Sequence, residues 1–375
     1  MCVVCNYATF FLVNFGYTTS KIGLVLAIGA VGSVFLQLAL GKLADRSRIL
    51  HWKRLLLWDC VLTAVIFTGL MFVKNTLAAG ILFGASYLAV HGLNPLINHA
   101  AFYMNSHGYS VNFGFSRGIG SLSFSVISMA LGHLTVTYGE IAVALTGVIL
   151  AALFFVTALF LPFHGTDSTE RKERKRGTDD RSFLRKYPAF ALMTVGMIFS
   201  LTAHNAVNTF MLQIMERVGG NSGTMGTAFS IAAILELPVL FGFMRIRRKF
   251  RIVDLMCCSA VFFIAKMTAV SLAKSVMGIY LAEGFQILSF ALYASASVYY
   301  ADERMSIEDK ATGQGWMASA AAAGGAIGNF AGGVANDHFG VAGLLWTAIG
   351  ATVIGAVLCV ISRQLEKRTP QDPLP

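Results

Sequence analysis

The residues of this sequence that could do chemistry are charged side chains embedded in long apolar stretches. Four stand out: Arg117, Glu236, Lys266 and Glu283. A charge inside a bilayer is costly, and intramembrane charges mark solute paths or proton relays. We therefore expect these four residues to couple a proton to the movement of a solute.

Glu236 is the strongest of these candidates. Eight residues separate it from Arg245, which places it roughly 12 Å inside the membrane at 1.5 Å per residue. Burial favours the neutral form of a carboxyl group, and Pro238 cannot donate a hydrogen bond to the carbonyl of Ile234. These features predict a protonation switch. The alternative is a neutral Glu236 that only hydrogen-bonds a neighbouring helix.

Lys266 and Glu283 are expected to pair. Lys266 lies eight residues before Lys274 and Glu283 nine after it, so both sit at similar depth in adjacent antiparallel helices. An unpaired charge there would cost about 2.5–3.5 kcal/mol. The alternative is that Lys266 extends its ammonium group out to the membrane surface.

Uncharged polar residues recur at helical spacing in several apolar segments. Steps of three and four residues put such side chains on one face of a helix. Four such stripes favour a solute path, although each residue alone could serve as a hydrogen bond between helices. The substrate-binding candidates are Gln37, His91, Asn94, His204, Asn208, Gln286 and Tyr293.

The elements that position these residues must be membrane helices. Of the 375 residues, 56% are hydrophobic and 13% are charged, against about 25% charged in a soluble domain. Ten stretches of 18 or more residues lack Asp, Glu, Lys and Arg, and about 20 apolar residues span a bilayer. This pattern excludes a soluble enzyme and a nucleic-acid-binding protein.

The apolar stretches define twelve helical spans, because they lack the alternation of barrel strands. The expected spans are 1–15, 21–41, 54–73, 77–99, 115–137, 141–163, 189–212, 223–244, 253–273, 276–299, 312–336 and 342–362. Alternate loops and the C-terminal tail hold 23 of the 29 basic residues. Basic loops stay in the cytoplasm, so both termini are predicted to be cytoplasmic.

The two halves of the chain resemble each other at a spacing near 200. Thr9-Phe10-Phe11-Leu12 matches Thr209-Phe210-Met211-Leu212, and Gly132 matches Gly333 at a spacing of 201. Two parallel repeats around a midplane site are a known plan for transporters. We expect an all-α membrane protein of two pseudo-symmetric six-helix bundles. The expected boundaries are bundles at 1–163 and 189–362, a cytoplasmic linker at 164–188 and a cytoplasmic tail at 363–375.

The first span is shorter than its counterpart. Its ~15 residues would measure about 22 Å, less than the ~30 Å hydrocarbon core. The repeat places the expected start of this helix about a dozen residues before Met1. We expect either that the first helix is truncated or that the bilayer thins there.

On these motifs the chain resembles a major facilitator superfamily transporter. Gly41-Lys42-Leu43-Ala44-Asp45-Arg46 fits the superfamily's loop between helices 2 and 3, although Arg48 stands near the position of a later glycine. The branch of lactose and nucleoside proton symporters is suggested by Arg117-Gly118-Ile119-Gly120-Ser121, Glu236-Leu237-Pro238 and Asp337-His338-Phe339-Gly340. The resemblance implies alternating access by rocking of two bundles, and a conformational gate at Gly41, Asp45 and Arg46.

The leading functional prediction is a secondary active transporter of a small polar solute, similar to a sugar or nucleoside, by proton symport in the plasma membrane. The alternatives are an efflux antiporter for amphipathic compounds and a non-transporting sensor on the same fold. An enzyme is not expected, because His91, Glu236 and His204 are not clustered in sequence, and Cys2-x-x-Cys5 lacks partners for a metal site. No cofactor, metal or nucleic acid is expected as a ligand, and the chain is expected to be a monomer.

Overall fold

The computed structural model describes residues 1–46, 52–109, 113–162, 180–306 and 309–368. Within these ranges the chain is helical and contains no strand. Ten helical segments are long and apolar enough to cross a membrane. The predicted all-α membrane fold is thereby confirmed.

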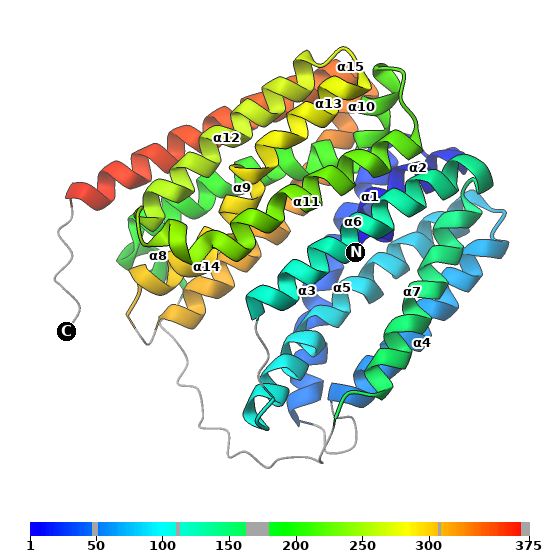
Figure 1. The fold of residues 1–375 in the computed structure, drawn as a ribbon, viewed down its shortest axis with the longest axis horizontal. Coiled ribbons are helices and arrows are strands. Elements are labelled where there is room, and N and C mark those ends of the chain that lie inside the picture. The colour runs from blue at the N-terminus through cyan, green and yellow to red at the C-terminus, as the bar shows by residue number, and fades with distance from the viewer. Residues whose placement is uncertain (47–51, 110–112, 163–179, 307–308, 369–375) are drawn as a thin grey trace.

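The helices form two bundles, which are apparent in Figure 1. The first bundle contains α1 (Cys2–Asn6), α2 (Ala8–Asn14), α3 (Thr19–Arg46), α4 (Trp52–Phe72), α5 (Thr76–Ser106), α6 (Phe113–Tyr138) and α7 (Ile141–Leu159). The second contains α8 (Asp180–Lys186), α9 (Pro188–Thr209), α10 (Met211–Arg217), α11 (Ser222–Arg247), α12 (Ile252–Leu272), α13 (Val276–Ala282), the 3-10 helix η1 (Glu283–Ile287), α14 (Phe290–Arg304) and α15 (Lys310–Arg368).

The helix α15 accounts for the last two predicted spans. It runs for 59 residues and bends at Gly340, whose φ of 65° and ψ of −172° are not helical. Glycine adopts a positive φ without the steric cost that a side chain would impose. The helix continues to Arg368, six residues beyond the predicted end of the last span at 362.

The first and seventh predicted spans are each broken into two helices. The break between α1 and α2 is at Tyr7, and that between α9 and α10 is at Phe210. Close to these breaks the hydroxyl of Thr9 donates a hydrogen bond to the carbonyl oxygen of Thr209 at 2.5 Å. These two residues are the pair that the 200-residue repeat relates, so equivalent positions of the two halves meet. The broken first span and the bent α15 make the described chain consistent with twelve spans.

The tenth predicted span, 276–299, lies within an apolar helical stretch long enough to cross a membrane, Val276–Arg304, but it is not one continuous α-helix. It divides into α13, η1 and α14, and Ser289 between the last two has a φ of −90° and a ψ of −93°. Backbone freed inside a membrane needs new partners. The hydroxyl of Ser259 on α12 donates to the Ser289 carbonyl at 2.8 Å, and the Ser289 hydroxyl donates to the Phe285 carbonyl at 2.8 Å.

The helix α3 is longer than predicted. It ends at Arg46 instead of 41, so Gly41, Asp45 and Arg46 have helical backbone and do not form a loop. The side chains of these three residues lie outside the described part of the structure. Their proposed gating role therefore stays a prediction.

The two bundles contact each other on the side predicted to be extracellular. Ser125 on α6 and Ser230 on α11 share a hydrogen bond of 2.6 Å between their hydroxyl groups. A Cβ atom on Gly132 would lie 2.9 Å from the Cα atom of Gly226, so these helices touch backbone to backbone. In Figure 1 the bundles meet near α1, α2 and α10 and diverge toward α8 and α14 in one bundle and the far ends of α3 and α5 in the other.

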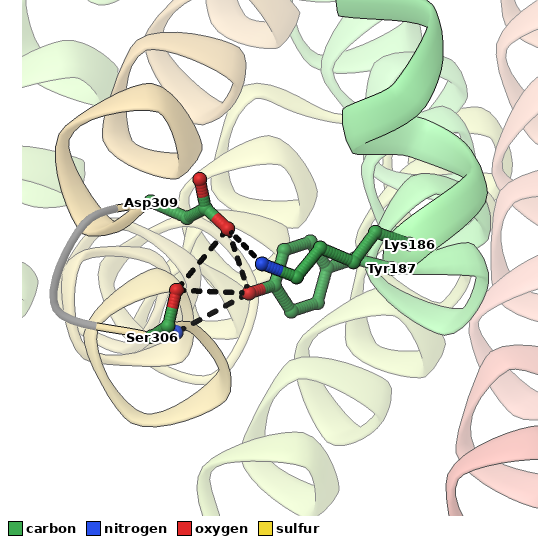
Figure 2. A network of polar contacts seen from close by, with 4 residues as sticks. All are labelled: Lys186, Tyr187, Ser306 and Asp309. Carbon is green, nitrogen blue, oxygen red and sulfur yellow. Dashed lines mark hydrogen bonds and ion pairs between the residues drawn. The ribbon is translucent and has the colours of Figure 1, made fainter. Parts of the chain in front are cut away.

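The end of the predicted linker is attached to the second bundle by four residues (Figure 2). The buried carboxylate of Asp309 accepts hydrogen bonds from Lys186 at 2.6 Å, Tyr187 at 3.0 Å and Ser306 at 3.1 Å. Hydrogen bonding to Asp309 raises the pKa of Lys186 above its ordinary value. Residues 164–179 of the predicted linker lie outside the described residues.

Candidate functional site

Four of the predicted site residues form one polar network inside the second bundle. The ammonium group of Lys266 on α12 contacts the Glu283 carboxylate at 2.7 Å and donates to the Gln286 side-chain oxygen at 2.6 Å. The Gln286 amide nitrogen donates to Glu236 on α11 at 2.8 Å. Lys266 and Glu283 are each 1% exposed, so the predicted pairing is confirmed and the alternative that Lys266 reaches the membrane surface was wrong.

The broken tenth span explains how this network can form. Glu283 and Gln286 both lie on η1, which turns three residues per turn and so brings side chains three apart onto one edge. Both side chains thereby reach the single ammonium group of Lys266.

The network fixes the orientation of the Gln286 amide. An ammonium group has only donors, so the oxygen of Gln286 must face Lys266 and its nitrogen must face Glu236. Oxygen Oε1 of Glu236 therefore accepts a hydrogen bond.

His204 and Asn208 extend the site along α9. Nitrogen Nε2 of His204 lies 3.1 Å from the Asn208 amide nitrogen. The His204 ring stacks on Phe290 with centroids 4.5 Å apart, and its Nδ1 atom is buried with no hydrogen-bond partner among the described residues. A buried nitrogen without a partner costs free energy. A ligand group at this position would satisfy it.

The first bundle contributes Arg117, which is solvent-exposed on α6. The depth of Arg117 follows from the contact between Ser125 and Ser230: Arg117 and Glu236 lie eight and six residues from these serines toward the same membrane face. At 1.5 Å per residue both are within about 12 Å of that contact. Arg117 and Glu236 therefore lie at similar depth on two helices of different bundles that contact each other.

The remaining candidates lie in the first bundle and do not join the network. The His91 ring stacks on Tyr87 with centroids 4.2 Å apart, and its Nε2 atom lies 3.5 Å from the Cys5 sulfur. Asn94 and Gln37 are half-buried on α5 and α3. The described structure thus gathers the candidates of the second bundle and leaves these three apart from them.

Sequence reasoning missed two contributors to this site. Phe290 was not predicted as a stacking partner of His204. Ser259 was not singled out. The sequence signal for Ser259 is weak, because a serine in an apolar helix usually hydrogen-bonds its own backbone.

The family of the chain follows from the match of its sequence to a family model. The model of the MFS_1 like family matches residues 2–347. The chain belongs to the MFS_1 like family. No curated protein sequence matches it.

Solved structures of transporters share the fold of this family member. A variant of the nucleoside transporter NupG superposes with a TM-score of 0.79 at 15% identity and 97% coverage of both chains. A bacterial homolog of the human lysosomal transporter Spinster, inward-facing and unoccupied, has a TM-score of 0.68 at 13% identity, covering 100% of this chain and 95% of its own. A variant of the peptide transporter POT in complex with alafosfalin has a TM-score of 0.72 at 12% identity, with 99% and 92% covered. At these identities the likeness establishes the fold alone.

Proposed function

We propose that this protein is a proton-coupled symporter of a small polar solute, with Glu236 as the proton site. The observation that carries the proposal is the charge of the polar network. Two carboxyl groups, Glu236 and Glu283, share one ammonium group, and Lys266 contacts Glu283. Counted within the second bundle alone, without Arg117, a fully ionised network would hold a net charge of −1 inside the membrane. One proton makes it neutral.

The cost of that charge gives the coupling mechanism. Moving an ionised carboxylate past an apolar constriction costs more free energy than moving a protonated carboxyl group past it. Glu236 is half-buried, so a proton can reach it in this conformation. Arg117 stabilises the ionised form when the two bundles bring it close. Separation of the bundles weakens that attraction and favours uptake of a proton.

The side chains around Glu236 suit a sugar or a nucleoside. Gln286, Asn208 and Tyr293 offer hydrogen-bonding groups for hydroxyls, and Phe290 with His204 offers flat rings for stacking. Binding sites of this kind combine apolar walls with a few placed polar groups. We favour a nucleoside because its base would use the rings and its ribose the amides. The structural likeness to the nucleoside transporter NupG agrees with this choice.

Uptake into proteoliposomes tests the proposal. The purified protein is reconstituted and presented with radiolabelled uridine or lactose, with and without an inward proton gradient. We expect accumulation of one of them that requires the gradient. Glu236→Gln keeps the size and the hydrogen bond of the side chain but cannot ionise. It should exchange solute across the membrane and fail to accumulate it.

Two results would overturn the proposal. Accumulation by Glu236→Gln at every pH would remove Glu236 as the proton site and pass the role to Glu283. Solute export driven by an inward proton gradient would replace symport by antiport. The matched control is Glu140→Gln, a carboxyl group outside the network that accepts a hydrogen bond from Asn14, and it should accumulate solute normally.

We also propose that the protein is a monomer in the plasma membrane, with both termini cytoplasmic. The support for the orientation is the distribution of basic residues, because Arg245, Arg247, Arg248, Lys249 and Arg251 lie in one of the loops predicted to face the cytoplasm. Labelling of Lys274→Cys by a membrane-impermeant reagent from outside intact cells tests the orientation. Labelling only after lysis would reverse it.

A further inference from the structure

One set of hydrogen bonds connects the two bundles at the beginning of α3. The backbone N–H of Thr19 donates to Asp337 Oδ1 at 2.9 Å, and that of Ser20 donates to Asp337 Oδ2 at 2.8 Å. The Thr19 hydroxyl donates to the Gly333 carbonyl at 3.0 Å and also contacts the Asp337 carboxylate. Asp337 lies on α15, more than 300 residues away in the chain.

These bonds complete the N-terminus of α3. The first N–H groups of a helix have no partner within the helix. Here the N–H of Lys21 is 3.5 Å from the Thr18 hydroxyl, and that of Ile22 bonds the Thr18 carbonyl at 3.0 Å. The two N–H groups left over, those of Thr19 and Ser20, are the ones that bond Asp337. A carboxylate at this end also interacts favourably with the helix dipole.

Other helix ends in the described structure are also completed by distant side chains, but within one bundle. Lys53 donates to the carbonyls of Leu159 and Leu161 at the end of α7, at 2.9 and 2.6 Å. Arg217 donates to the carbonyls of Val270 and Ala273 at the end of α12. Such contacts persist when a bundle moves as a rigid body. The hydrogen bonds between Asp337 and α3 cannot persist in this way, because Asp337 belongs to one bundle and α3 belongs to the other.

We propose that Asp337 is a latch that holds the predicted extracellular side closed by capping the N-terminus of α3. When the bundles separate on that side, the carboxylate and the N–H groups of Thr19 and Ser20 return to water. Asp337 is exposed, so water replaces these bonds at little cost and the latch opens reversibly. The close approach of α3 to α15 is part of the device, since a Cβ atom on Gly333 would collide with the Thr19 carbonyl oxygen.

The latch rests on the proposed transport function only in requiring that this side opens. Its test measures a distance and needs neither a solute nor a proton gradient, so it can fail or succeed independently of symport. Spin labels are placed at Lys74→Cys, between α4 and α5, and at Lys274→Cys, between α12 and α13. Both lysines are exposed. The background carries Cys5→Ala and Cys258→Ala, because the other four cysteines are buried.

We expect Asp337→Ala to raise the ratio of molecules with separated bundles to molecules with closed bundles about tenfold. This change is equivalent to about 1.4 kcal/mol, which is typical of the loss of a helix cap. Asp337→Asn keeps the shape of the side chain without its charge and should shift the ratio in the same direction, by less. Glu140→Gln removes a carboxylate that bonds within the first bundle on the same side and should leave the ratio unchanged.

Gly333→Ala provides a second route to the same result. It leaves Asp337 intact but pushes α15 away from Thr19, and should also raise the separated population. It serves in place of Asp337→Ala if that variant is not monodisperse on size exclusion. The latch is refuted if the Asp337 variants, or Gly333→Ala in their place, show the same distance distribution as Glu140→Gln, within twofold.

Discussion

Removal of Lys266 is the perturbation whose effect the structure specifies most closely. Lys266 is 1% exposed and contacts Glu283 and Gln286 at 2.7 and 2.6 Å. Lys266→Met leaves the Glu283 carboxylate buried without its ion-pair partner. The Oε1 atom of Glu283 already has no hydrogen-bond partner among the described residues. Breaking a buried ion pair by removing one partner costs about 3–5 kcal/mol.

The double variant separates the charge from the side chain. In Lys266→Met/Glu283→Gln no buried charge remains unpaired, and the remaining loss is that of unsatisfied polar groups, about 1–3 kcal/mol. Melting temperatures shift by about 2–4 °C per kcal/mol for domains of 150–250 residues, the size of one bundle. We expect the single variant to lose at least about 6 °C and the double variant to recover roughly half of its loss.

Thermal unfolding in detergent, followed by intrinsic fluorescence, measures these shifts. Lys274→Met is the matched control, because Lys274 is exposed at the turn between α12 and α13, and its melting temperature should not change. Equal losses in the single and double variants would show that the two charges are not coupled. A Lys266→Met variant as stable as Lys274→Met would refute the buried pair itself.

Three further predictions concern the contacts around the site. Asp309→Ala should lower the melting temperature by several degrees. Because the ion pair with Asp309 raises the pKa of Lys186, the stability that the pair contributes is lost only as the pH rises through that raised pKa, so the difference in melting temperature from wild type should be constant from pH 6 to about 9. A difference that changes within this pH range would contradict the prediction. Ser259→Ala should lower stability by about 1–2 kcal/mol because the Ser289 carbonyl loses its donor; an unchanged melting temperature would refute this role. His204→Ala should weaken solute binding about tenfold or more, measured by titration calorimetry, because the ring that stacks on Phe290 is lost; unchanged affinity would place the solute elsewhere.

The parts of the fold that follow from local pattern could be predicted from the sequence. The membrane spans follow from the length of the apolar stretches, and the repeat follows from residue matches at a fixed spacing. The pairing of Lys266 with Glu283 follows from their similar depth, counted in residues from Lys274. The break at η1 could not be predicted in this way, because it is stabilised by Ser259 from another helix. The end of α3 was placed too early because the uncharged stretch ends before Lys42, whereas the helix continues to Arg46.

Contacts between the bundles were also beyond the sequence. Asp337 was noted as part of a motif, but its bonds to Thr19 and Ser20 join residues that only the packing of α3 against α15 brings together. The stacking of His204 on Phe290 likewise joins two helices. In both cases the residue types indicated polar function, while the partner depended on tertiary geometry.

Movement of protons with the solute tests the central claim most directly. Proteoliposomes that contain a pH-sensitive dye are prepared without any gradient, and uridine or the solute identified by uptake is added outside. A proton symporter carries protons inward with the solute, so the lumen should become more acidic with the wild-type protein and should not change with Glu236→Gln. Solute entry without acidification in the wild type, or equal acidification in both proteins, would contradict the assignment of Glu236 as the coupling site.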